Sequence, residues 1–398
     1  MVEWKEVKLS DVAEIVGGAT PSTKDDENYT GGNIAWITPK DLSNFTGRYI
    51  SEGERCITEK GYNSCSTQML PKHSVLFSSR APIGYVAISD RQLCTNQGFK
   101  SAIPGPNIDY LFLYYLLKFK KDAIESMGSG TTFKEVSGNV MKNVLIEIPV
   151  DIDIQKKIAC ILDKIDSKIE NNNSINRNLE EQALLLFKSW FLDYEPYSNV
   201  KPETWEDGVL GDFVTIKRGG SPRPIQEYLT DKGLRWLKIS DVTSLSSPFV
   251  IDIAECIKES GLKKTVFLKA GSLVLSNSAT PGVPKILDVD SCIHDGWLYF
   301  TESQFSNEFL YLYFKHIRRN LVALGNGSVF TNLKTDILKG YPTVKPERNV
   351  LEEFDSIVFP MFEEMRRIAR ENHKLSELRD SLLPRLMSGE LDVSDLDI

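Results

Sequence analysis

Residues 154–194 read IQKKIACILDKIDSKIENNNSINRNLEEQALLLFKSWFLDY, and this stretch decides how the rest of the chain is organised. Apolar and amide side chains recur at alternating steps of four and three residues, the spacing that forms one stripe along an α-helix. The stretch contains neither glycine nor proline, so it predicts an unbroken helix that packs on a second helix. The stripe consists of Ile158, Leu162, Ile165, Ile169, Asn172, Asn176, Leu179, Ala183, Leu186 and Trp190.

The predicted partner of this helix lies near the C-terminus, where the same alternation returns. Its stripe consists of Phe354, Val358, Met361, Met365, Ile368, Asn372, Leu375, Arg379, Leu382 and Leu386. We expect the two helices to form an antiparallel coiled coil, about 60 Å long at roughly 1.5 Å per residue. Pro384 is expected to kink or end the second helix. The asparagines on the stripes allow two interpretations: buried amides that fix the helix register, or partly hydrated positions.

The sequence before each helix is a diverged copy of the other, displaced by roughly 200 residues. Both copies contain short apolar runs bounded by Gly, Pro, Asn and Asp, which predict strands and turns. The matching segments are 4–12 and 205–213, 34–42 and 234–242, 70–84 and 268–282, and 94–99 and 292–297. Small-residue loops at 128–133 and 325–330 also correspond, and they are either helix ends or phosphate contacts.

These features predict an α+β protein with a pseudo-two-fold internal repeat. Two mixed α/β modules are separated by a long antiparallel two-helix coiled coil. The expected boundaries are a first module at 1–150, a central helix at 151–195, a linker at 196–204, a second module at 205–346, a C-terminal helix at 347–389 and an acidic tail at 390–398. The tail carries acids without a base, so we expect it to be frayed.

Composition limits the classes of function. The 47 Lys and Arg against 55 Asp and Glu give a net charge of −8, which argues against non-specific coating of nucleic acid. The 6 cysteines are scattered without a Cys-x-x-Cys pair, so we expect reduced thiols and no metal site. No apolar run approaches the roughly 20 residues needed to span a bilayer, and a cytoplasmic location is expected.

Motifs that would carry catalysis are missing. The sequence has no Gly-x-x-x-x-Gly-Lys-Ser/Thr loop for nucleotide phosphates and no Asn-Pro-Pro-Tyr or Asp-Pro-Pro-Tyr motif of a DNA amino-methyltransferase. It also lacks a convincing acidic cluster for Mg²⁺. We therefore expect a binding protein without a cofactor rather than an enzyme.

A set of motifs occurs in the same order in both halves, each set followed by a coiled-coil helix. The first half carries them at 17–22, 36–42, 78–84 and 95–99, and the second half at 219–224, 236–241 and 294–297. In this arrangement the chain resembles the specificity subunits of type I restriction-modification systems, HsdS. The resemblance implies two target-recognition domains, each reading one half of an asymmetric, bipartite sequence of double-stranded DNA, with helices that set the spacer. It further implies docking of two methyltransferase subunits and, through the assembled complex, of translocase-nuclease subunits.

Polar residues in these motifs are the candidate DNA contacts. They are Lys40, Ser78, Ser79, Arg80, Asn96, Gln97, Lys217, Arg218, Arg223, Lys238, Ser276, Asn277 and His294. Arginine can bond guanine and an amide can bond adenine in the major groove, whereas basic side chains also contact phosphates. The alternatives are a surface ion pair for Arg80, and turn hydrogen bonds for Asn96 and Gln97.

Two other features admit a purely structural explanation. The glycine pairs 17–18 and 219–220 either supply a positive φ angle or let the backbone approach a phosphate beside basic residues. Trp36 and Trp236 are expected to be core anchors, and His294 a hydrogen-bonded structural histidine rather than a metal ligand.

A second class of function is a protein-interaction scaffold. Its modules would bind partner polypeptides, and the partners would make all DNA contacts. The acidic pI near 5.3 favours this alternative. A free-standing enzyme is a third possibility that the missing motifs disfavour.

Overall fold

The computed structural model describes residues 2–397 apart from 44, 131–133, 244 and 325–332. The chain forms two compact units: the first comprises Met1–Glu170 and Leu375–Ile398, and the second comprises Asn171–Lys374. Each unit contains one module together with part of each long helix. The loop predicted at 325–330, and part of the one at 128–133, lie outside the described residues. No helix in the described part is long and apolar enough to cross a membrane.

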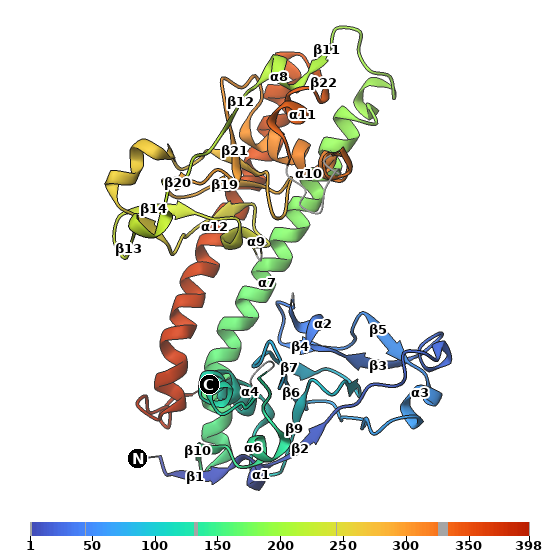
Figure 1. Cartoon of the computed structure of the whole chain (residues 1–398), viewed down its shortest axis with the longest axis vertical. Coiled ribbons are helices and arrows are strands. Elements are labelled where there is room, and N and C mark those ends of the chain that lie inside the picture. Colours follow the sequence, from blue (N-terminus) through green and yellow to red (C-terminus); the bar gives the residue numbers. More distant parts are fainter. Residues whose placement is uncertain (1, 44, 131–133, 244, 325–332, 398) are drawn as a thin grey trace. The chain divides into compact units, whose positions relative to one another are not determined.

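The first unit is built on short strands joined by turns (Figure 1). They are β1 (Trp4–Lys8), β2 (Ala13–Gly17), β3 (Ile34–Ile37), β4 (Tyr49–Ile50), β5 (Arg55–Ile57), β6 (Val75–Phe77), β7 (Val86–Ser89), β8 (Cys94–Thr95), β9 (Lys100–Pro104) and β10 (Leu145–Pro149). A five-stranded sheet has the order β2-β9-β6-β7-β4, and a three-stranded sheet has the order β5-β3-β8. Among the described strands of this unit, β4 with β7 and β3 with β8 are the parallel pairs, and β1 pairs antiparallel with β10.

The helices of the first unit cover its sheets and carry its core. They are α1 (Leu9–Val12), α2 (Pro39–Ser43), α3 (Glu59–Asn63), α4 (Tyr110–Phe119), α5 (Lys121–Ser126) and α6 (Gly138–Lys142), followed by the start of α7 (Ile152–Phe191). Asp109 caps α4 by accepting hydrogen bonds from the backbone of Leu111 and Phe112. Phe112 and Leu116 then pack, fully buried, against Phe77 of β6.

The second unit repeats this architecture. Its strands are β11 (Glu206–Val209), β12 (Thr215–Arg218), β13 (Leu229–Thr230), β14 (Leu234–Leu237), β15 (Phe249–Val250), β16 (Cys256–Ile257), β17 (Val266–Leu268), β18 (Leu273–Ser276), β19 (Pro284–Leu287), β20 (Ser291–Ile293), β21 (Trp297–Thr301) and β22 (Pro342–Lys345). The order β12-β21-β18-β19-β15 matches the five-stranded sheet of the first unit, and the parallel pair β15 with β19 occupies the same place. The series β16-β14-β20, with β14 parallel to β20, matches β5-β3-β8 and is flanked by β13 and β17.

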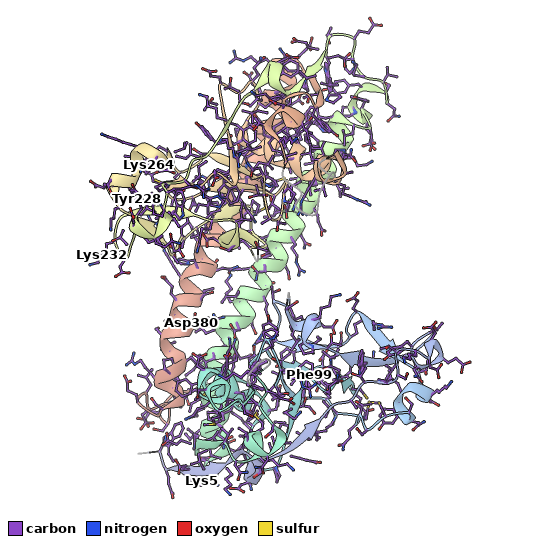
Figure 2. All side chains as sticks on the ribbon, in the orientation of Figure 1. Lys5, Phe99, Tyr228, Lys232, Lys264 and Asp380 are labelled. Carbon is purple, nitrogen blue, oxygen red and sulfur yellow. The ribbon has the colours of Figure 1, made fainter. Side chains whose placement is uncertain are left out.

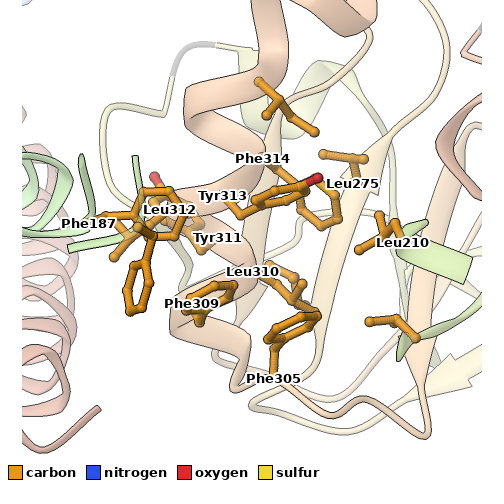
Figure 3. Packing of buried hydrophobic residues seen from close by; sticks show 14 of the residues in the cluster. Phe187, Leu210, Leu275, Phe305, Phe309, Leu310, Tyr311, Leu312, Tyr313 and Phe314 are labelled. Carbon is orange, nitrogen blue, oxygen red and sulfur yellow. The ribbon is translucent and has the colours of Figure 1, made fainter. Parts of the chain in front are cut away.

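An aromatic cluster joins the second module to both long helices. The helices of this unit are α8 (Leu210–Phe213), α9 (Ser240–Thr243), α10 (Asn307–Leu324), α11 (Thr335–Lys339), the end of α7 and most of α12 (Arg348–Met387). Phe187 of α7 lies 5.2 Å from Phe309 of α10 and 6.2 Å from Phe354 of α12 between ring centroids. Figure 3 shows aromatic side chains of α10 in this cluster, among them Phe309, Tyr313 and Phe314. The module and the helices therefore share one core.

Within each unit α7 and α12 pack side by side in opposite directions, as the stripes predict. In the first unit Ile158 and Leu162 share a buried cluster with Leu386. In the second unit the side-chain amide of Asn172 donates to Asn372 at 2.8 Å, and Phe187 packs on Phe354. Rising numbers on α7 thus meet falling numbers on α12, which confirms the antiparallel pairing.

The other predicted stripe residues lie in or beside the same seam. Val358, Met365 and Ile368 are buried, whereas Ile165, Ile169, Leu179, Leu186, Met361, Leu375 and Leu382 are partly buried. Asn172 and Asn176 are buried, so the partly hydrated interpretation is wrong for these two asparagines. Asn372 is partly buried and also donates to Asn173 at 2.9 Å, so the amides link the two helices directly.

Opposite charges attach each module to its helix. In the first unit the guanidinium of Arg48, which is 6% exposed, contacts Asp163 and Glu170 of α7. In the second unit the polarity is reversed: Asp288 accepts two hydrogen bonds from Arg370 of α12, at 2.7 and 2.8 Å. The two attachments therefore carry opposite signs on the module side.

The structure corrects two expectations about the C-terminal region: Pro384 does not end its helix, and the tail is partly packed. Helix α12 passes through Pro384 and ends at Met387, because Gly389 adopts a left-handed backbone (φ 74°) that terminates the helix. The acidic tail is not frayed throughout, since Val393 is buried in the core of the first unit. Lys157 of α7 also donates to the backbone carbonyl of Ser394 at 2.7 Å.

Candidate nucleic-acid interface

The serine loops of the two modules have the same internal hydrogen bonds. The hydroxyl of Ser78 donates to the carbonyl of Pro82 at 2.8 Å and accepts from the backbone N–H of Tyr85 at 2.8 Å. Ser276 makes the equivalent bonds with Thr280 at 2.5 Å and Val283 at 2.9 Å. Both serines are fully buried, so they hold the loop in shape and present no hydroxyl to a surface.

The residues after these serines are also part of the scaffold. The backbone N–H of Ser79 donates to Gly98 at 2.7 Å, and that of Asn277 donates to Gly296 at 2.8 Å. Both side chains are buried, and the Asn277 side-chain amide donates to the carbonyl of Asp295 at 3.3 Å. Ser79 and Asn277 therefore join the serine loop to the turn that contains Gly98 or Gly296.

Asn96 and His294 perform the same local task. Each follows a strand of a parallel pair, β8 or β20, and accepts a hydrogen bond from the backbone N–H two residues later. The Asn96 side chain accepts from Gly98 at 2.9 Å, and Nδ1 of His294 accepts from Gly296 at 2.7 Å. Burial lowers the pKa of His294, so the imidazole is neutral at neutral pH and can accept this bond. The turn tolerates either residue because each supplies one acceptor.

The next position distinguishes the modules by charge. In the first module the side chain of Gln97 accepts from the hydroxyl of Thr20. In the second, Asp295 accepts from the hydroxyl of Ser221 at 2.6 Å. The Ser221 hydrogen bond and the nearby Arg223 hold the pKa of Asp295 below its usual value, so it is a carboxylate at neutral pH.

Asp295 gathers the basic residues of the second module. Arg223 lies 3.2 Å from its carboxylate, and Nε of Arg218 donates to its backbone carbonyl at 2.5 Å. Sequence reasoning selected both arginines but missed Asp295 and Ser221. The signal was the replacement of the amide of Gln97 by a carboxylate beside a turn rich in arginine.

The structure contradicts the positive-φ explanation of the glycine turns and shows a packing reason for them. Neither Gly18 nor Gly219 has a positive φ angle. A Cβ on Gly18 would lie 2.2 Å from the carbonyl oxygens of Thr95 and Asn96, and one on Gly219 would lie 2.2 Å from the carbonyl oxygen of His294. The close approach is thus between two segments of the protein, which seats the turn against the Asn96 or His294 turn.

Trp36 on β3 and Trp236 on β14 lie beside the contact between the glycine turn and the Asn96 or His294 turn. Trp36 is buried and donates its indole N–H to the carbonyl of Ala19 at 3.1 Å. Trp236 is buried in the corresponding place on β14, with its ring 6.0 Å from that of His294. The expectation that both are core anchors is confirmed.

The remaining candidates are accessible cations, most of them in ion pairs. Arg80 pairs with Glu135 at 3.0 Å, Lys40 with Glu54 at 2.6 Å, and Lys238 with Glu255 at 2.5 Å. Lys217 is exposed, and the described residues place no carboxylate at ion-pair distance from it. Surface pairs are worth about 0–1 kcal/mol, so these cations can exchange a carboxylate for another anion.

A cleft of about 730 Å³ in the second unit brings several of these residues together. Arg223, Lys238 and His294 line it with Trp236, and the polar residues Ser221 and Glu255 complete the wall. Lys238 and His294 each directly follow one of the parallel strands β14 and β20, whose carboxyl ends meet at one edge of the sheet.

Further basic side chains lie on the segment between β16 and β17. Lys264 donates to the hydroxyl of Tyr228 at 2.7 Å, and both residues are labelled in Figure 2. Lys258 donates to the backbone carbonyl of Glu227 at 2.7 Å. Sequence reasoning did not select these lysines because they lie outside the repeated motifs.

The long helix α12 also presents an open groove within the second unit, about 760 Å³ in volume. Its lining alternates in sign along the helix, with Glu363, Arg367, Arg370 and Lys374 among the residues. Two large apolar side chains, Ile357 and Phe359, are exposed on the same helix. Because residues two apart do not share a face of a helix, Ile357 and Phe359 lie on different sides of α12. Exposed apolar side chains on a charged helix are typical of a surface that meets another protein.

Comparison with known proteins agrees with this architecture. The family model described as "Type I restriction modification DNA specificity domain" matches residues 1–181 and 202–345. The chain is 35% identical to the type I restriction enzyme MjaIX specificity subunit of Methanocaldococcus jannaschii, over 99% of this chain and 95% of that protein. It is 24% identical to the HindI specificity subunit of Haemophilus influenzae, over 98% and 100% of the two chains.

A solved structure shares the fold at low sequence identity. The crystal structure of a type I restriction-modification S subunit from M. genitalium superposes with a TM-score of 0.59 at 16% identity, covering 97% of this chain and 96% of the other. Two matched domains, a full-length relative and this common fold lead to one assignment. The chain belongs to the family of type I restriction-modification specificity subunits.

Proposed function

We propose that this chain is the sequence-specific DNA-recognition subunit of a type I restriction-modification complex. Each module reads one half of an asymmetric, bipartite site in double-stranded DNA, and the chain itself performs no chemistry. The observation that carries this proposal is that two modules with one strand order present different side chains at the same turn: Asn96 and Gln97 in one, His294 and Asp295 in the other. Unlike modules on one chain fit an asymmetric target.

We assign the contacts with DNA to the accessible candidates. Arg80, Gln97 and Lys40 serve the first module, and Lys217, Arg218, Arg223 and Lys238 serve the second. Arginine and amide side chains suit base edges, whereas lysines suit phosphates. The buried candidates Ser78, Ser79, Ser276 and Asn277, with Asn96 and His294, position the turns that present these side chains. The proposed module boundaries are 1–150 and 205–346.

An acidic protein can bind DNA in this way because its cations are local and exchangeable. Arg80 and Lys238 are paired with Glu135 and Glu255, and such pairs are lost at small cost when a phosphate or base edge replaces the carboxylate. The net charge of −8 then suppresses non-specific binding, because the rest of the surface repels the duplex.

The two long helices have two proposed roles. They set the length of the spacer between the half-sites, and they dock two methyltransferase subunits. For this docking α12 offers its charged groove and the exposed side chains of Ile357 and Phe359. Translocase-nuclease subunits join through the assembled complex. A cytoplasmic location, where such a complex meets DNA, is part of this proposal.

A module exchange tests the proposal. Residues 1–150 are replaced by the first module of another specificity subunit, and methylated sites are mapped by sequencing in cells that carry the methyltransferase subunit. We expect one half-site to change while the other half-site and the spacer stay constant. A scaffold whose partners make all DNA contacts would leave both half-sites unchanged, and that result would reject DNA recognition by the modules. Exchanging residues 205–346 is the matched control and should change only the other half-site.

A further inference from the structure

A cavity outside the candidate interface collects positive charge in the second unit. Its volume is about 250 Å³, and it lies between α9 with the residues after it, the loop that follows β18, and α10. Lys285, Lys315 and Arg318 line it together with Thr243 and Thr280. None of its lining residues is an Asp or Glu.

Lys285 is the unusual member of this group. It lies on β19, is 4% exposed, and donates from its ammonium to the backbone carbonyls of Leu245 at 2.8 Å and of Ser247. In the described parts of the chain no carboxylate lies at ion-pair distance from it. Burial lowers the pKa of Lys285 to about 8, so it is mostly charged at neutral pH. A buried cation held only by neutral carbonyls is costly to keep.

The fold does not require a lysine at this position. On β19 Lys285 pairs with Val274 of β18, and in the first module the same place in the sheet pairs Ala87 of β7 with Leu76 of β6. Ala87 is fully buried. The second module therefore has the charged side chain of Lys285 where the first module has the methyl group of Ala87.

The neighbouring cations differ in how far they are already compensated. Lys315 pairs with Glu180 at 2.8 Å, and the same carboxylate accepts from the hydroxyl of Tyr311 at 2.6 Å. Arg318, one turn further along α10, makes a long contact of 3.4 Å from Nε to the carbonyl of Pro281. Lys285 and Arg318 thus supply charge that the chain itself does not neutralise among its described residues.

We propose that this cavity binds a phosphate-type oxyanion, with Lys285 and Arg318 as its cationic ligands. Charge-assisted hydrogen bonds to an oxyanion would offset the cost of burying the Lys285 ammonium. The neutral carbonyls offset this cost less, because they carry no negative charge. The phosphate comes either from the DNA backbone or from free phosphate in solution. The site itself does not depend on the proposed function; only its occupation by DNA does.

Thermal unfolding of the full chain tests the site without DNA. The midpoint is measured in increasing inorganic phosphate and in sodium chloride of matched ionic strength. We expect a saturable upward shift that is specific to phosphate, is lost in Lys285→Met and needs about tenfold more phosphate in Arg318→Gln. Arg348→Gln, which alters an exposed pair on α12, is the control and should keep the wild-type shift. Equal midpoints of the wild type in the two salts, or an equal phosphate shift in wild type and Lys285→Met, would overturn the proposal.

DNA binding then identifies the source of the phosphate. If the site takes a backbone phosphate, Lys285→Met weakens binding of the target duplex at all sequences and lowers the salt-dependence slope by about one. If the source is free phosphate, the variant loses the phosphate shift but binds DNA as the wild type does. Failure of the proposed function looks different, because no duplex would then bind specifically while the phosphate shift of the wild type remained.

Discussion

Removal of the Arg48 side chain is expected to weaken the attachment of the first module to α7. The guanidinium donates to both carboxylate oxygens of Glu170, at 3.0 and 2.8 Å, to the hydroxyl of Ser167 at 2.8 Å, and to Asp163. Arg48→Met would keep most of the apolar stem and remove the guanidinium that Asp163, Ser167 and Glu170 share. No other described residue contributes so many polar bonds between this module and the helix.

The expected cost follows from how buried the partners are. Breaking a fully buried ion pair from one side costs about 3–5 kcal/mol. The side chains of Asp163 and Glu170 are 31% and 34% exposed, so water recovers part of their solvation. We therefore expect about 2–3 kcal/mol of lost stability, which is a large share of the roughly 5–15 kcal/mol that holds a domain folded.

Urea unfolding of the full chain measures this cost, with native-state hydrogen exchange to assign the loss to the first unit. Two transitions are expected if the units unfold separately, and only that of the first unit should move. Lys72→Met is the matched control, because its pair with Asp90 at 3.1 Å is half exposed and should be worth less than about 1 kcal/mol. A loss for Arg48→Met no larger than that of the control would refute the assignment.

Further predictions concern the turns, the helix seam, the buried lysine and the spacer. Gly18→Ala should lower the unfolding free energy by at least about 1–3 kcal/mol, because its Cβ would meet two carbonyl oxygens. Gly17→Ala is the control and should be nearly neutral, because the nearest atom to its Cβ is Cδ of Lys100 at 4.0 Å. Equal urea midpoints of the two variants would contradict this. Replacing Asn172 and Asn372 together by leucine should raise the thermal midpoint, since both partners of a polar pair in the helix seam are removed. A drop would show that the amides are needed for packing. The depressed pKa of Lys285 means that the unfolded chain binds more protons than the folded chain between about pH 8 and 10.5. In phosphate-free buffer the free energy of unfolding of Lys285→Met should therefore be about 3 kcal/mol higher than that of the wild type at pH 7. This difference should shrink as the pH rises through that window. A seven-residue insertion in each long helix adds about 10 Å, so methylation mapping should reveal a spacer longer by roughly three base pairs or no recognition. An unchanged spacer with full activity would contradict the proposal that the helices set the spacer length.

The arrangement of two modules and two long helices could be predicted from the sequence, because it depends on patterns among residues that are near one another in the chain. The stripes on α7 and α12 depend only on spacing along one helix, and the repeat depends only on the order of short segments. The antiparallel pairing of the two helices followed from these patterns, whereas the order of the strands came from the structure. The family assignment agreed with them, although the individual domain boundaries stay predictions.

The roles of single polar residues could not be predicted in the same way. Ser78 and Arg80 are close neighbours in one loop, yet one hydroxyl is buried in the loop and the other side chain is exposed in an ion pair with Glu135. The glycine turns looked like sites of special backbone geometry, whereas a facing strand end explains Gly18 and Gly219. In each case the deciding partner lies far away in the sequence.

By itself, the sequence determined that two similar modules alternate with two helices and that the class of protein is a DNA specificity subunit. Only the tertiary structure decided which polar groups are free to act. Asp295 became the centre of an arginine cluster because residues 218–223 fold against it, and Lys285 became a buried cation because β19 lies inside its sheet under α10. Periodicity is a property of neighbouring residues, whereas burial and charge pairing depend on segments that meet only when the chain has folded.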